Sequence, residues 1–225
     1  MVSRSRRFLA TSAVMLGVAL GVVLIALSLG GASADRSTAS PWLSTYLGDT
    51  KVEMGRRSVG DPNAPVRILV YFDFQCGHCQ RLHEQIEGEL IKRYVATGTA
   101  YLEARPVPFL GQASLQAAEG AMAAADQGAF WDYRDALFTT WASDGPSTYS
   151  SAGLRSIAGK IGLDVNAFGQ SLAAQSSLAE LKQIYQEAQD SGVEAVPTVV
   201  INGKAIVGVQ PIETYDQAID EALHK

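Results

Sequence analysis

The sequence is poor in the side chains that usually hold metal ions. Its 225 residues include only two cysteines and three histidines. A closed zinc site takes four ligands, and two thiols without a second cysteine pair supply only half of one. We therefore expect no metal site and no separate cofactor.

The sequence also lacks an excess of positive charge. Its net charge is −5, and the first 34 residues carry Arg4, Arg6 and Arg7 but no acidic residue, so the remainder carries about −8. It has no basic stripe, no internal repeat and no long low-complexity segment. Nucleic acid and anionic lipid headgroups are therefore poor candidate partners.

Long apolar runs are absent except at the N-terminus. Three arginines precede an apolar stretch from Phe8 to about Ala32, which is the layout of an export signal. Ala32-Ser33-Ala34 matches a cleavage site, but the stretch is also long enough to span a bilayer. Residues 1–34 are thus a cleaved signal peptide or an uncleaved anchor. Either interpretation places the rest of the chain outside the cytoplasm, secreted or anchored to the membrane.

The remaining residues, about 190, suit one domain. Residues 35–57 resemble a linker, because they mix Ser, Thr, Gly and charged residues. A nearly continuous apolar run then predicts a strand covered on both faces, and later segments have helical spacing. The expected elements of domain 58–225 are a strand at 66–72, a helix at about 77–97, a strand at 100–105, a helical block at about 113–175, a helix at 178–188, a hairpin of strands 198–201 and 205–207, and a helix after Pro211. This order is α/β, that of a thioredoxin fold with an all-helical insertion.

Both cysteines lie in Phe74-Gln75-Cys76-Gly77-His78-Cys79, between the first strand and the first helix. Unpaired amides at a helix start stabilise a thiolate, and a protonated His78 would add positive charge. We therefore expect Cys76 to be the reactive thiol and Cys79 the less exposed, resolving one. A Cys76 thiol titrating about three units below neutral pH would stabilise the reduced form by about 4 kcal/mol, roughly 90 mV of oxidising power.

The cysteine pair could instead be a permanent disulfide or half of a metal site. A bridge that closes two intervening residues restricts the unfolded chain little, since its effect grows with loop length. Both alternatives stay open.

A proline further along the chain, in Val196-Pro197, precedes the strand at 198–201. A proline at the first residue of a strand is tolerated, so it can mark a simple strand boundary. It can also form a cis peptide bond beside Cys76, with the Val196 backbone facing a substrate.

Four separated segments together resemble the DsbA-like family of thiol-disulfide oxidoreductases within the thioredoxin superfamily. The resemblance covers about residues 59–223. The segments are the opening turn Gly60-Asp61-Pro62-Asn63-Ala64-Pro65, the segment Tyr71-Phe72-Asp73-Phe74-Gln75-Cys76-Gly77-His78-Cys79, the helical stretch Ala118 to Phe138, and Gly192-Val193-Glu194-Ala195-Val196-Pro197-Thr198.

The resemblance implies a role for each matching residue. Cys76 would be the nucleophile that links to substrate, Cys79 the resolving thiol and Pro197 a cis-proline. Gly77-His78 is a dipeptide also seen in protein disulfide isomerases. One position departs from the pattern, because Val70 stands where such proteins often bury an acid. Asp73 and Glu103 are substitute proton acceptors, although Asp73 also fits a turn or capping role and Glu103 a strand residue at the sheet edge.

The resemblance further implies a function and partners. The chain would form disulfides in exported proteins with free thiols, using only the Cys76–Cys79 disulfide. A membrane electron-transfer partner would reoxidise it, and it would act as a monomer. The rivals are a reductase or isomerase of the same fold, and a tethered binding or chaperone module.

Overall fold

The structure is a computed structural model, and it describes residues 40–224. The predicted signal or anchor (1–34) and the start of the predicted linker (35–39) lie outside the described residues. Within residues 40–224, every helix is too short or too polar to cross a membrane.

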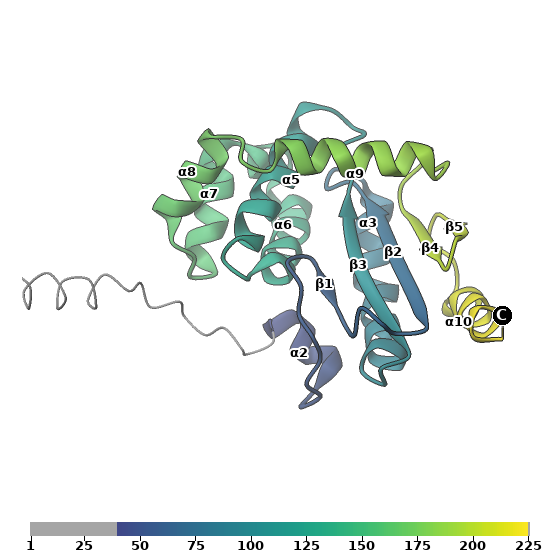
Figure 1. Cartoon of the computed structure of the whole chain (residues 1–225). Helices are drawn as coiled ribbons and strands as arrows, with labels where there is room; N and C mark the ends of the chain where they lie inside the picture. Colours follow the sequence, from purple (N-terminus) through teal and green to yellow (C-terminus); the bar gives the residue numbers. More distant parts are fainter. Residues whose placement is uncertain (1–39, 225) are drawn as a thin grey trace, which may run out of the picture. The chain divides into compact units, whose positions relative to one another are not determined.

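A five-stranded mixed sheet forms the centre of the described chain (Figure 1). The strands lie in the order β1-β3-β2-β4-β5, and β2 and β3 are parallel while the other neighbours are antiparallel. Their bounds are β1 (Ser58–Val59), β2 (Val66–Phe72), β3 (Ala100–Pro106), β4 (Thr198–Ile201) and β5 (Lys204–Val207). The four longer strands confirm the sequence prediction. The two residues of β1 were not predicted, because so short a strand has no periodicity.

One continuous helical segment connects β2 to β3, as a parallel pair requires. It consists of α3 (Gly77–Leu82), η1 (His83–Glu87), α4 (Gly88–Leu90) and η2 (Ile91–Val95), where η1 and η2 are wider π-type turns. Its apolar side chains, among them Leu82, Ile86 and Leu90, are buried in the core. The connection places residue 76 at the carboxyl end of β2 and at the start of this helix.

The predicted insertion is entirely helical, and its members gather on one side of the sheet in Figure 1. They are α5 (Gln112–Ala125), α6 (Phe130–Asp144), the 3₁₀ helix η3 (Gly145–Tyr149), α7 (Ser151–Lys160) and α8 (Val165–Ala173). Helix α9 (Leu178–Asp190) contacts β3 and leads back to β4, and α10 (Ile212–Leu223) packs near β2 and β4. The thioredoxin fold with a helical insertion is therefore confirmed.

The described part of the predicted linker does not behave as a free tether. Residues Pro41–Leu47 form helix α2, capped by the Ser40 side chain, and Leu43 and Leu47 are buried. Trp42 stacks on His83 and on Trp131, with ring centroids 4.5 and 5.8 Å apart. The folded unit therefore includes the described residues from 40 onward. The linker prediction rested on polar composition and could not take into account the aromatic contacts of Trp42.

Candidate active site

Cys76 occupies the cap position at the start of α3. Its backbone is extended, and its sulfur lies 3.4 Å from the backbone nitrogen of Cys79, which donates to it. Cys76 is half-buried and Cys79 is fully buried, and both are free thiols. The predicted arrangement of an accessible first sulfur and a buried second one is therefore present.

The surroundings of the two sulfurs separate their acidities. A hydrogen bond from the Cys79 side chain, together with the backbone amides of Cys79 and His78, lowers the pKa of Cys76 from 9.0 to about 6, although partial burial opposes this. Burial raises the pKa of Cys79, and its hydrogen bond to Cys76 raises it further. At neutral pH the pair therefore holds one thiolate, at Cys76, beside one protonated thiol.

The Asp73 carboxylate fixes the turn that leads into α3. It accepts hydrogen bonds from the backbone nitrogen of Gln75 (2.7 Å), the Ser114 hydroxyl (2.6 Å) and the backbone nitrogen of Leu110 (2.9 Å). The Asp73 backbone nitrogen also lies 3.4 Å from the Cys79 sulfur. These contacts match the turn or capping role, and the charge of Asp73 raises the pKa of both cysteines.

The loop before β4 lies against the first sulfur. The peptide bond Val196–Pro197 is cis, and the Val196 carbonyl oxygen is 3.5 Å from the Cys76 sulfur. Val196 is half-buried and Pro197 is buried. The structure thus brings together two segments that are 120 residues apart in the sequence.

The two residues between the cysteines are exposed. A Cβ on Gly77 would meet no neighbouring atom within 4 Å, so this position is open. The His78 ring lies beside Arg81, with its Nδ1 2.8 Å from the Arg81 guanidinium. His78 acts on the Cys76 sulfur through its backbone amide, whereas the sequence had suggested its side-chain charge.

Glu103 does not lie at the edge of the sheet, contrary to prediction. It is a buried residue of β3, which pairs with β1 on one side and with β2 on the other. Its carboxylate forms ion pairs with Arg57, Arg67 and Arg105. This network gives Glu103 a structural role that does not involve the cysteines, and Val70, at the position of the missing acid, is an apolar residue fully buried in β2.

His83, a residue of η1 in the helical segment after the cysteines, is buried. It is 1% exposed, and its ring nitrogens lie 2.9 Å from a Glu87 carboxylate oxygen and 3.1 Å from an Asp135 oxygen. Arg134 pairs with the same Glu87 through two contacts of 2.7 Å, and both side chains are fully buried. Charged partners from the insertion account for a burial that helical spacing alone did not indicate.

Sequence reasoning missed two residues that hold the active-site segment in place. Ser114 donates to Asp73 and accepts from the Gln75 side chain at 2.8 Å. The Tyr149 hydroxyl donates to the Phe74 carbonyl oxygen at 2.6 Å. Ser114 and Tyr149 come from the helical insertion, and no local sequence signal indicates that they return to the cysteines.

The sequence and structure match known proteins of one family. A sequence model described as thioredoxin matches residues 52–221. A probable disulfide bond formation protein D of Bacillus anthracis is 26% identical over 76% of this chain and 79% of its own length. The crystal structure of oxidised BdbD from Bacillus subtilis superposes with a TM-score of 0.69 at 20% identity, covering 76% of this chain and 94% of that one.

Other relatives are much longer than this chain. The Na(+)/H(+) antiporter NhaA 3 of Salinispora tropica is 30% identical over 73% of the chain, but this match spans only 24% of the antiporter. The chain therefore covers about a quarter of the length of such relatives.

Proposed function

The chain belongs to the thioredoxin family and has the DsbA-like fold, and on that premise we propose that it forms disulfides in exported proteins through Cys76 and Cys79. The observation that carries the proposal is the accessible Cys76 sulfur, whose pKa is lowered to about 6 beside the buried Cys79. A thiolate is the reactive form of cysteine and a good leaving group, so this position suits thiol–disulfide exchange.

The proposed reaction starts from the oxidised form, in which the two sulfurs are bonded. A substrate thiolate attacks the Cys76 sulfur, a mixed disulfide forms, and Cys79 leaves with the electron pair and takes up a proton. A second substrate thiolate then attacks the substrate sulfur of the mixed disulfide, and Cys76 leaves as a thiolate. The substrate gains a disulfide, and the pair gains two electrons.

The local surroundings favour this direction to a moderate extent. A Cys76 pKa of about 6 instead of 9.0 stabilises the reduced pair at neutral pH by about 1.4 kcal/mol, roughly 30 mV. This is smaller than the roughly 90 mV expected for a thiol that titrates three units below neutral pH. We therefore propose an oxidant of moderate strength.

The same pKa is also compatible with one rival, a reductase or isomerase of the same fold. A pair that is only moderately oxidising also exchanges disulfides in the reverse direction when its cellular partner supplies electrons. A binding or chaperone module is the more distant rival, and retained function in a Cys76→Ser variant would favour it.

We also propose the setting in which the pair works. The arginines and apolar stretch before residue 35 support a place outside the cytoplasm, secreted or anchored to the membrane. The reduced pair then needs an acceptor of two electrons, for which a membrane electron-transfer partner is the proposed class. The chain acts as a monomer in this proposal. Asp73 is the proposed acceptor of the Cys79 proton when the pair is oxidised again.

Two measurements test the proposal. First, the equilibrium potential of the cysteine pair should lie on the oxidising side of the glutathione couple. Second, the oxidised chain should convert a reduced two-cysteine peptide to its disulfide form while its own Cys76–Cys79 disulfide is reduced. A potential well below that of glutathione would instead identify a reductase.

A further inference from the structure

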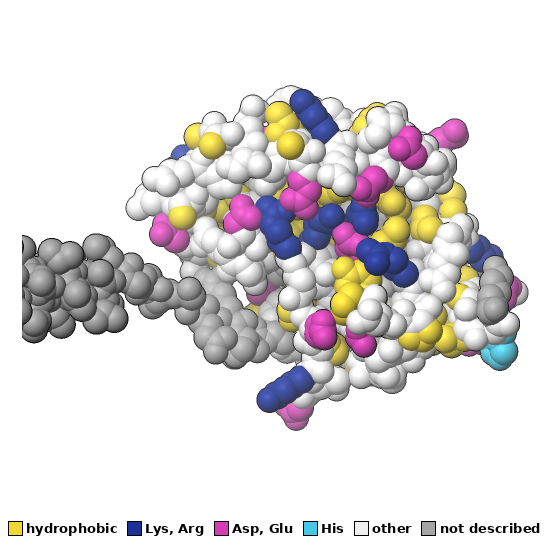
Figure 2. All heavy atoms as spheres, viewed as in Figure 1, with side chains coloured by type: hydrophobic (Ala, Val, Ile, Leu, Met, Phe, Trp, Pro, Cys, Tyr) yellow, Lys and Arg dark blue, Asp and Glu magenta, His cyan; other side chains and the backbone are white. Residues whose placement is uncertain are grey.

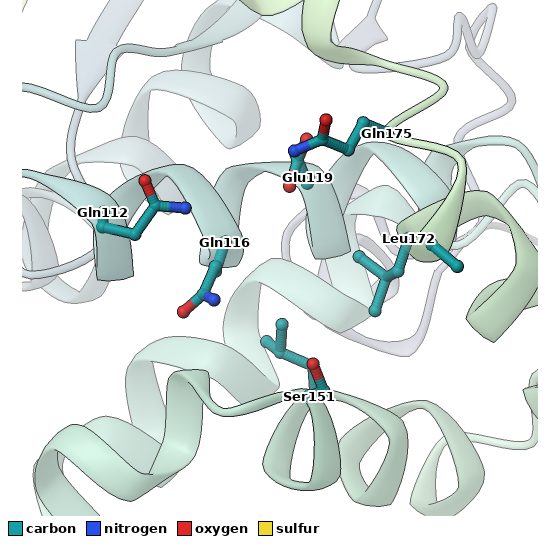
Figure 3. A pocket seen from close by; sticks show the side chains of 8 residues that line it. Gln112, Gln116, Glu119, Ser151, Leu172 and Gln175 are labelled. Atoms are coloured by element: carbon teal, nitrogen blue, oxygen red, sulfur yellow. The ribbon is translucent and has the colours of Figure 1, made fainter.

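A cavity lies within the helical insertion, outside the site described above. It has a volume of about 210 Å³ and is walled by α5, α7, α8 and the turn after α8 (Figure 3). Pockets for whole ligands are usually larger, about 300–1,000 Å³, so this one suits a single side chain. Its lining residues are Gln112, Gln116, Glu119, Ser151, Leu154, Leu172, Ala173 and Gln175.

Glu119 lines this cavity as a buried acid without a partner. Glu119 is only 7% exposed, and its Oε1 atom has no hydrogen-bond partner among the described residues. None of the ion pairs in that part of the chain involves Glu119. Burial alone raises the pKa of this carboxyl group. A buried polar atom without a partner costs stability, so each such atom in a native structure calls for an explanation.

The other polar side chains of the cavity supply oxygen acceptors. Gln112 and Gln116 lie on the same side of α5 as Glu119, Ser151 begins α7, and Gln175 comes from the turn after α8 (Figure 3). The lining contains no lysine, arginine or histidine. Leu154 and Leu172 add an apolar wall, which suits the methylene stem of a long side chain.

We propose that this cavity is a subsite for an arginine side chain of a polypeptide substrate. A guanidinium group carries five donors and no acceptor, and it pairs with a carboxylate through two parallel hydrogen bonds. A single carboxylate among neutral amides neutralises one positive charge, whereas calcium sites gather several carboxylates. The net charge of −5 also attracts a basic partner.

The position of the cavity connects it to the cysteines, and this substrate assignment rests on the proposed function. Leu110, two residues before Gln112, donates to Asp73 and accepts a hydrogen bond from the Gln75 side chain, directly before Cys76. The start of α5 is thus attached to the active-site segment. The proposal requires that a polypeptide held at Cys76 pass this helix start and present a basic side chain to Glu119.

The test uses two cysteine-free peptides that are identical except for arginine or its neutral analogue citrulline. Calorimetry on the full chain should show the arginine peptide binding at least about tenfold more tightly, the value of one charge-assisted hydrogen bond. Glu119→Gln should remove the difference. Glu213→Gln, which makes the same substitution at an exposed residue of α10, should preserve it. Equal binding of both peptides by the unaltered chain overturns the proposal.

A stability measurement separates a ligand site from a structural role. Without peptide, Glu119→Gln should melt at or above the temperature of the unaltered chain, because it removes an unpaired buried charge. A clear loss of stability would mean that Glu119 supports the fold, and would overturn the proposal. The arginine peptide should raise the melting temperature of the unaltered chain but not of Glu119→Gln.

Oxidation kinetics distinguish failure of the subsite from failure of the proposed function. Two-cysteine peptides with arginine should show a lower KM than those with citrulline, at equal kcat. Oxidation of both at equal KM overturns the subsite alone. Absence of any oxidation, with the arginine preference retained in calorimetry, overturns the disulfide-forming function and leaves the arginine site in place.

Discussion

At the level of single residues, the proposed chemistry depends on the different surroundings of two sulfurs. Cys76 receives backbone amide hydrogen bonds, and Cys79 is buried behind it. The motif predicted which sulfur is reactive, because a helix start follows the first cysteine. It did not predict the size of the pKa shift, which depends also on Asp73 and on partial burial.

Cys79→Ala should trap substrates covalently. The variant retains the Cys76 thiolate but has no second thiol to release a mixed disulfide. Expressed in an exporting cell, it should yield covalent adducts on a non-reducing gel, and the adducts should disappear on reduction. Cys76→Ser serves as the control and should yield none. A Cys79→Ala sample without adducts would argue against substrate capture by Cys76.

Arg134→Met should destabilise the fold by about 3–5 kcal/mol, because it leaves the buried Glu87 carboxylate without its cation. Urea denaturation measures the loss. The double variant Glu87→Gln/Arg134→Met should recover part of it, since no buried charge then remains. An Arg134→Met variant as stable as the unaltered chain would show that Arg134 is not the main partner of Glu87.

At the scale of elements, the helices and the longer strands follow from periodicity, whereas α2 does not. Its seven residues are mostly apolar but span only two helical turns, too short a segment to show a helical period. Its stability comes from the buried Leu43 and Leu47, from Trp42, and from contacts of Ser40 and Trp42 with the Asp132 carboxylate. The helical insertion was predicted as a block, but its hydrogen bonds to Asp73 and Phe74 were not. Such long-range contacts follow from packing and have no local signal.

Trp42→Ala should lower the free energy of unfolding by about 2 kcal/mol, because it removes two aromatic contacts and half-buried apolar area. Chemical denaturation of the full chain measures this. Thr45→Ala, on the exposed side of the same helix, should change stability by less than about 0.5 kcal/mol. Equal stabilities of the two variants would mean that residues 41–47 are a tether after all.

At the level of the whole molecule, one domain carries the cysteine pair where β2 ends and α3 begins, next to the helical insertion. Figure 2 shows basic and acidic side chains intermixed over the described face, without a uniformly basic surface. This agrees with the composition, which made nucleic acid a poor candidate partner. The order of the longer strands and the helices along the chain, and the fold class, could be predicted from the sequence. The burial of His83 and Glu103 could not, because both contact charged partners distant in sequence.

Acid should destabilise the fold partly through Glu87. Burial raises its pKa, but Arg134 and His83 more than offset this, so the pKa falls from 4.5 to about 2. Because the pKa of Glu87 is lower in the folded chain, the unfolded chain binds more protons in this range. The stability that ionised Glu87 contributes is therefore complete above a pH of about 4.5 and is lost as the pH falls towards 2. Urea midpoints across this window should fall less in Glu87→Gln than in the unaltered chain. Parallel pH profiles would contradict the assignment.

Titration of the Cys76 thiolate in the reduced full chain tests directly whether this sulfur is activated. Ultraviolet absorbance of the thiolate, followed against pH, should rise with a midpoint of about 6, and Cys76→Ser should lack this step. A midpoint near 9, the ordinary value for a cysteine, would show that the helix start and the buried neighbour do not activate the sulfur.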